Sequence, residues 1–261
     1  MVNDEEAFDL KKDLAVFFIV LICFCFASCK GEVNGSVISS KMSSLQDTQL
    51  ANEYKYEIVD DGIKIISHNN CQESSIIIPE KLEGKLVKIL GRDAFYQHKS
   101  TVTIILPESL MTIEGSPFYR CYSLNEIIIP SGVKEISSNP FFRCSSLTEI
   151  RVASGNTHYI AMDGVMFNID KTELIAYPEG KLSENYIIPE SVKKLNIDSF
   201  GYETKIKRLT IPSNVVEFPD GNMFVFPDKI TLIVESGSDA EKYAIDNELK
   251  YEIQDLISVS K

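Results

Sequence analysis

The sequence has no tryptophan and only three histidines, His68, His98 and His158, in 261 residues. It also lacks a Gly-x-Ser-x-Gly nucleophile motif, a His-Glu-x-x-His zinc motif and a phosphate-binding loop. Catalysis needs a nucleophile, an acid-base group or a metal held close to its partner groups. Because the sequence contains none of these motifs, we predict that the protein is not an enzyme and uses no cofactor.

Positive charge is scarce as well. Lys and Arg number 26 against 38 Asp and Glu, which gives a formal net charge of −12. A chain of this charge repels phosphate backbones, so we exclude nucleic acid as a partner. Hydrophobic residues make up 44% of the sequence, which is enough for one or two packed domains.

No apolar run reaches the ~20 residues that span a bilayer as a helix. The longest run, residues 14–27, follows Lys11 and Lys12 and ends in small residues, which is typical of an export signal. Its end, Phe26-Ala27-Ser28-Cys29, resembles the lipobox of bacterial lipoproteins. The resemblance implies that residues 1–29 are a lipoprotein signal peptide and that Cys29 carries a lipid. The lipid would anchor the protein to a membrane of the bacterial cell envelope, on the outer surface. An uncleaved anchor or an ordinary export signal remains an alternative.

A period of 23 residues runs through the body of the chain. Pro107 and Pro130 each follow an apolar triplet and lie 23 residues apart, as do Pro189 and Pro212. Other columns keep the same period, and the column eleven residues after the prolines contains Phe118, Phe141, Phe200 and Met223. Each unit has a short strand with alternating apolar residues, which proline ends because it donates no ladder hydrogen bond. One such unit cannot bury its apolar side alone, so we predict a mostly β solenoid of stacked units with short turns or helices between strands.

The repeat unit resembles that of the BspA-like leucine-rich repeat family of surface proteins from anaerobes and spirochaetes. The matching segments include Phe118-Tyr-Arg-Cys121-Tyr-Ser-Leu124 and Phe141-Phe-Arg-Cys144-Ser-Ser-Leu147. The similarity covers about residues 54–253 and departs from the family pattern in the last unit, at Met223, Phe226 and Pro227. It implies a leucine-rich repeat solenoid that binds other proteins at the cell surface.

The domain organisation follows from the repeat. We assign residues 30–52, rich in Ser, Gly, Asn and Gln, to a flexible tether. Residues 53–94 form an N-terminal strand cap and first unit, residues 95–236 the solenoid, and residues 237–261 a C-terminal cap. An insertion, residues 154–188, interrupts the solenoid.

Two parts of this organisation predict specific elements. Within the insertion, Val165–Phe167 and Leu174–Tyr177 predict a β-hairpin, which we interpret as a structural spacer, with a partner contact as the alternative. In the C-terminal cap, Ser238 is expected to cap a helix and Tyr251–Ile253 to form a last strand.

One column of the repeat contains His98, Cys121 and Cys144. Neighbouring members of a column lie about 5 Å apart in a stack. The column is therefore a possible zinc site, or a disulfide between the two cysteines. We favour a third interpretation, in which these are buried side chains at family positions, because free cysteine is among the most buried residue types. We predict no metal.

Another column points away from the core. It contains the residues Ile105, Ile128, Arg151, Ile188, Thr210 and Ile233. An outward strand position in a solvated sheet is usually polar, so exposed isoleucines there would mark a partner surface. The alternatives are that the insertion or a neighbouring molecule covers them, or that strand propensity alone selected them.

These inferences lead to two hypotheses on function. The first is a non-catalytic surface protein that binds a protein ligand, as in adhesion to host or neighbouring-cell proteins. The second is a periplasm-facing scaffold that associates with itself or with another envelope protein.

Overall fold

The computed structural model describes residues 52–60 and 62–254 of the chain. The predicted signal peptide, Cys29, nearly all of the predicted tether and the last seven residues of the predicted C-terminal cap lie outside this range. Within it, no helix combines the length and the apolar character that a membrane span requires.

The described chain is mostly β, as predicted. Its strands are β1 (Tyr54–Val59), β2 (Gly62–His68), β3 (Ser75–Ile77), β4 (Lys81–Leu82), β5 (Lys85–Leu90), β6 (Thr103–Ile105), β7 (Thr112–Ile113), β8 (Glu126–Ile129), β9 (Glu135–Ile136), β10 (Glu149–Val152), β11 (Tyr159–Met162), β12 (Val165–Asn168), β13 (Glu173–Ala176), β14 (Asn185–Ile187), β15 (Lys194–Leu195), β16 (Arg208–Ile211), β17 (Thr231–Val234) and β18 (Tyr251–Ile253). The helices are the 3-10 helix η1 (Pro227–Lys229) and the α-helix α3 (Asp239–Asp246).

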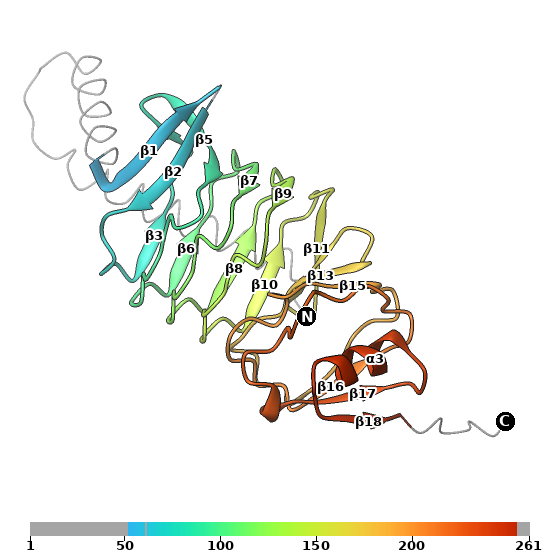
Figure 1. The fold of residues 1–261 in the computed structure, drawn as a ribbon. Coiled ribbons are helices and arrows are strands. Elements are labelled where there is room, and N and C mark those ends of the chain that lie inside the picture. The colour runs from blue at the N-terminus through green and yellow to red at the C-terminus, as the bar shows by residue number, and fades with distance from the viewer. Residues whose placement is uncertain (1–51, 61, 255–261) are drawn as a thin grey trace, which may run out of the picture. The chain divides into compact units, whose positions relative to one another are not determined.

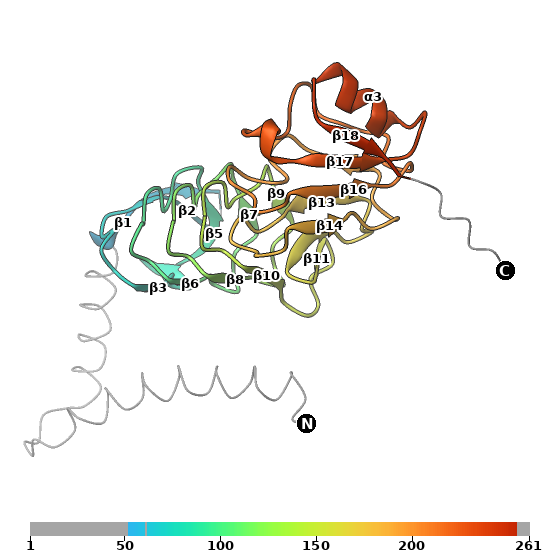
Figure 2. The same ribbon diagram turned by 90° about the horizontal axis from the view of Figure 1, so that it is seen from below.

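The 23-residue period is visible in the register of the parallel strands. In the sheet β10-β8-β6-β3, Glu149 pairs with Glu126, and Glu126 pairs with Thr103. In the sheet β14-β16-β17-β18, Arg208 pairs with Thr231 at the same interval. Equivalent residues of successive units therefore lie side by side, which confirms the predicted solenoid. Figure 1 shows β3, β6, β8 and β10 next to one another, and Figure 2 shows the same order from another side.

The inward strand residues and the phenylalanines of the turns form the core. The Phe118 ring stacks on Phe95 at 5.8 Å and on Phe141 at 5.6 Å between centroids, and all three rings are buried. In the last unit Phe224 rather than Met223 stacks on Phe200, at 5.5 Å, although both are buried. This ladder of rings explains why a large aromatic residue recurs once in each unit.

The predicted hairpin joins two hydrophobic clusters. β12 and β13 pair antiparallel, as expected from the sequence. Met166 and Ala176 pack in the cluster of the N-terminal units, whereas Val165 and Phe167 pack in the cluster of the C-terminal units. Successive strand residues point to opposite faces, so one hairpin completes both cores. Its buried residues support the interpretation as a structural spacer.

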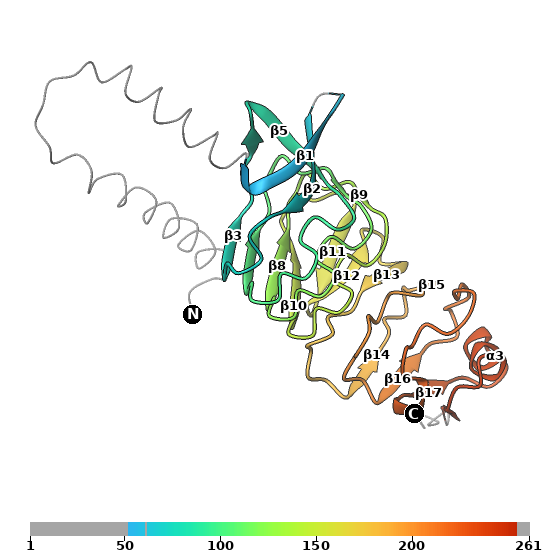
Figure 3. The same cartoon turned by 60° about the vertical axis from the view of Figure 1, so that its left-hand side comes forward.

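Both ends of the described chain also contain the predicted elements. β1 and β2 form an antiparallel pair. At the other end, the Ser238 hydroxyl accepts a hydrogen bond from the Glu241 amide and caps α3. β18 pairs with β17, and Figure 3 shows α3 near β17.

Candidate binding surfaces

The residues predicted to form an outward stripe lie in two separate sheets. In the first, Ile77, Ile105, Ile128 and Arg151 lie in one row across β3, β6, β8 and β10. Ile77 is 52% exposed and Ile105 is 44% exposed, whereas Ile128 is half-buried. Arg151 donates two hydrogen bonds to Glu149, at 2.9 and 3.0 Å. This stretch is an apolar row that ends in an ion pair.

The second stretch requires a correction. Ile188 was predicted to point outward, but it is fully buried, and its neighbour Ile187 is 69% exposed. Adjacent residues of an extended chain face opposite sides, so the assignment of Ile188 was wrong by one position. Ile187 pairs with Thr210, and Thr210 pairs with Ile233. Thr210 and Ile233 are both half-buried.

The column of His98, Cys121 and Cys144 does not converge on one site. Each cysteine thiol donates to a carbonyl of the preceding unit, Cys121 to Phe95 at 3.2 Å and Cys144 to Phe118 at 3.1 Å. Both thiols are free and buried. No group of three metal-binding side chains was found in the described part of the chain. Burial raises the pKa of Cys121 to about 12, so the thiol rather than the thiolate is its stable form.

His98 instead pairs with His68. The Nε2 atom of His98 lies 2.9 Å from Nδ1 of His68. Both rings are buried, and the centre of the His68 ring lies 4.8 Å from that of Tyr54 and 5.6 Å from that of Phe95. Desolvation lowers the pKa of both histidines, with the neighbouring His98 lowering that of His68 further. The pair is therefore neutral and closes the N-terminal end of the core.

A second aromatic column runs beside the buried phenylalanines. Tyr96 and Tyr119 stack at 5.6 Å, Tyr119 and Phe142 at 6.0 Å, and the series continues through Tyr202 to Phe226. All five side chains are exposed or half-buried. We call these residues the aromatic column.

Cations accompany the aromatic column. The Arg120 guanidinium lies 5.1 Å from the centre of the Tyr119 ring, and that of Arg143 lies 3.5 Å from Tyr202. Arg120 and Arg143 both have left-handed backbones, with φ of 65° and 64°. These turns place each arginine directly after a column aromatic. Such cation–π contacts hold a long side chain in place while leaving guanidinium N–H groups for a partner.

The Glu179 carboxylate links the two turns that flank the insertion, so the aromatic column continues from one to the other. In regular units the amide at this turn donates to the next turn, as Arg120 does to the Phe142 carbonyl. After Arg143 the insertion separates this turn from the next one in the sequence. Here Oε1 of Glu179 accepts hydrogen bonds from the amides of Arg143 and Tyr202, both at 2.6 Å. Burial raises the pKa of Glu179, and these amides partly oppose the shift. The carboxylate thus replaces the missing backbone acceptor.

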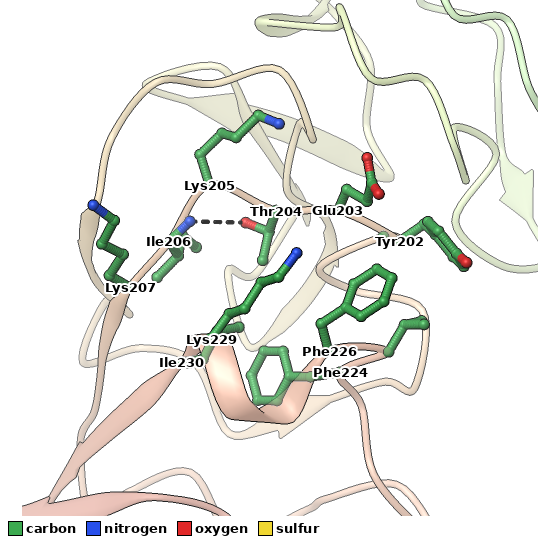
Figure 4. A pocket seen from close by; sticks show the side chains of 12 residues that line it. Tyr202, Glu203, Thr204, Lys205, Ile206, Lys207, Phe224, Phe226, Lys229 and Ile230 are labelled. Carbon is green, nitrogen blue, oxygen red and sulfur yellow. Dashed lines mark hydrogen bonds between the residues drawn. The ribbon is translucent and has the colours of Figure 1, made fainter.

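A pocket of about 390 Å³ opens at the C-terminal end of the aromatic column. Its apolar side consists of Tyr202, Ile206, Phe224, Val225, Phe226 and Ile230. Its cations are Lys205, Lys207 and Lys229, and Glu203 is its one acidic side chain. Figure 4 shows Lys229 extending between Thr204 and the Phe226 ring, and its Nζ atom lies 4.4 Å from the ring centre.

Sequence reasoning had not identified the aromatic column or the pocket. The signal was present as a second aromatic directly after Phe95, Phe118 and Phe141, which are followed by Tyr96, Tyr119 and Phe142. Tyr202 and Phe226 are shifted within their units, so no fixed period leads to them. Only the stacked structure places them in line.

The repeat model of the BspA-type leucine-rich repeat region matches six copies, within residues 61–181 and 176–235. The chain belongs to this family. The matches cover well over half of the chain and include the units that carry the aromatic column. Membership agrees with the resemblance that the Phe-x-Arg-Cys segments indicated.

A comparison with solved structures found several bacterial leucine-rich repeat proteins at low sequence identity. The leucine-rich cell surface protein of Faecalibacterium prausnitzii is 15% identical, with 80% of this chain and 76% of that chain covered and a TM-score of 0.41. The leucine-rich repeat protein of T. pallidum is 19% identical, with 77% and 96% covered and a TM-score of 0.46. The pneumococcal vaccine antigen PcpA is 15% identical, with 78% and 97% covered and a TM-score of 0.31. A search of curated proteins found no match.

Proposed function

We propose that this BspA-type repeat protein is a non-catalytic binding protein of the bacterial cell surface. In this proposal a lipid at Cys29 anchors it, and the solenoid binds a protein of the host or of a neighbouring cell. The aromatic column is the observation that carries the proposal. Tyrosine and arginine are enriched among the residues that dominate binding energy at protein interfaces. Here they form one continuous, partly exposed row from Tyr96 to Phe226.

The rigidity of the row supports a binding role. Each ring contacts the next, and Arg143 rests on Tyr202. Side chains that are already ordered lose little conformational entropy when a partner binds, so more of the contact energy appears as affinity. A purely structural row would not need its arginine head groups at the surface.

Binding by the exported polypeptide from residue 30 onward tests the proposal. We expect it to bind a matrix protein or host cells above background, and the Tyr96→Ala/Tyr119→Ala variant to bind at least about tenfold more weakly. Leu182→Ser is the matched control, because Leu182 is 83% exposed and is not part of the column. Absence of binding by the unaltered polypeptide to any such target would remove the basis of the proposal.

Anchoring and location need a separate test. Cys29→Ser is expected to abolish incorporation of labelled fatty acid into the protein and to release it from the membrane fraction. Protease treatment of intact cells should degrade the anchored protein if it faces outward. Full protection from protease in intact cells, with cleavage after lysis, would instead support a periplasm-facing position.

The row of Ile77, Ile105 and Ile128 favours a second candidate, a self-associating envelope scaffold. An exposed apolar row on a sheet is a common self-association surface. If this row holds copies together, Ile105→Ser/Ile128→Ser should reduce the oligomer size in sedimentation experiments. An unchanged size would exclude the row as the contact.

A further inference from the structure

The pocket at the end of the aromatic column is positively charged in a chain of net charge −12. Lys207 is paired with Glu184 at 2.5 Å, so its charge is already matched. Lys205 and Lys229 have no ion-pair partner in the part of the chain that the structure describes. Glu203 is the one carboxylate among the lining residues. The pocket therefore offers two lysine ammonium groups to a ligand.

The same pocket has an apolar and aromatic wall. Phe224, Ile206 and Ile230 are buried and form its base. Phe226 is half-buried and lies between Lys229 and Tyr202, with a Tyr202–Phe226 centroid distance of 5.4 Å. A ligand that fits must therefore present a negative charge next to apolar groups. Pockets of a few hundred Å³ with few polar groups are typical of sites that hold a single side chain or a small ligand.

We propose that this pocket binds a carboxylate side chain of an acidic, aromatic-containing peptide segment. The carboxylate would pair with Lys229 and Lys205, and the flanking residues would lie along the aromatic column toward Arg143. The inference rests on the proposed protein-binding function and assigns the chemistry of the partner. Arg143 extends the positive charge beyond the pocket, because it has no carboxylate partner in the described residues.

A peptide fits this geometry better than an acidic polysaccharide. Sugars bind aromatic residues through the ring faces, but here Tyr119 stacks between Tyr96 and Phe142, and Arg143 covers a face of Tyr202. The rings therefore present mainly their edges, which suit the aromatic and aliphatic side chains of a protein. The lysine pair supplies the charge complementarity that selects carboxylates.

The test uses the exported polypeptide and a fluorescent peptide of alternating glutamate and phenylalanine, with binding followed by anisotropy. We expect Lys205→Met/Lys229→Met to weaken binding by at least about tenfold, since charge-assisted hydrogen bonds are lost. Lys242→Met is the control, because Lys242 is an exposed lysine of α3 that does not line the pocket. It should change binding less than about twofold. The corresponding peptide with glutamine in place of glutamate should bind at least about tenfold more weakly.

Four results would overturn the inference. They are equal binding of the glutamate and glutamine peptides, equal losses in the double variant and in Lys242→Met, no binding of the glutamate peptide, and preferential binding of polygalacturonate. The last result would assign the pocket to an acidic polysaccharide. If matrix or host-cell binding persists while the acidic peptide does not bind, only this inference fails, and the proposed function stands.

Discussion

The Glu179 carboxylate accepts the Arg143 amide at 2.6 Å across 36 residues of sequence. Its Oε1 atom also accepts the Tyr202 amide, so one oxygen joins the unit before the insertion to the unit after it. Arg143 lies over the Tyr202 ring on the same junction. The insertion therefore interrupts the sequence period without interrupting the aromatic column.

Removal of this acceptor is expected to destabilise the protein. Glu179→Ala leaves two buried amides without partners, which should lower the free energy of unfolding by at least about 2 kcal/mol. Glu179→Gln keeps an oxygen at the same position and should cost less than half as much. Urea unfolding monitored by circular dichroism measures both. Equal losses in the two variants would mean that the carboxylate charge, and not its acceptor geometry, stabilises the junction.

Replacement of Gly201, which lies at the junction, should be costly. Its φ is +64°, and a Cβ atom there would lie 2.4 Å from the Glu179 carboxylate. We expect Gly201→Ala to cost more than about 2 kcal/mol, because the strain of a left-handed alanine adds to this clash. Gly155→Ala is the control, since Gly155 has φ +86° but no neighbour within 4 Å. It should cost only about 1 kcal/mol. Similar losses at both positions would show that Glu179 moves aside freely.

Acid should open the N-terminal end of the solenoid first. The pKa of His68 and His98 is lowered in the folded protein, chiefly by desolvation, while Glu73 acts in the opposite direction on both. Folding therefore favours the neutral rings. Their contribution to stability is complete above the unfolded pKa of about 6.5 and is lost as the pH falls from there toward the lower folded pKa values. We expect the protection of the β1 and β2 amides against hydrogen exchange, measured relative to the intrinsic exchange rate at each pH, to fall between pH 7 and pH 5 before that of β16 and β17.

A variant checks the origin of that acid effect. His98→Gln keeps a side-chain hydrogen-bonding group next to His68 but removes one titrating ring. It should make the exchange protection of β1 and β2, relative to the intrinsic rate, less dependent on pH. Unchanged pH dependence would place the titration elsewhere.

Most of the fold could be predicted from the sequence, because the residues that recur every 23 positions are those that fill the core. Ile127 recurs as Ile150, and Phe118 recurs as Phe141, because each pair fills equivalent buried positions of successive units, and burial of large side chains dominates folding energy. The Ile188 assignment was wrong because the 23-residue period, counted back from Thr210, places Ile187 and not Ile188 in the outward column. A shift of one residue reverses inside and outside in a strand. The aromatic column was missed because its last two members, Tyr202 and Phe226, depend on the junction at Glu179 and on an irregular last unit. Residues of different units that meet at the surface produce no clear pattern in the local sequence.

Thiol labelling separates the interpretations of the cysteine column. Cys71 is exposed, whereas Cys121 and Cys144 are buried, and burial raises their pKa values. Reagents attack thiolates, so Cys71 of the native exported polypeptide should react quickly and the other two only after unfolding. Mass spectrometry of digests after labelling under native and denaturing conditions identifies each site. A Cys71→Ser variant should then show almost no native labelling. A disulfide between Cys121 and Cys144 would instead leave both unlabelled in denaturant until a reductant is added, and labelling of both without reductant would exclude it.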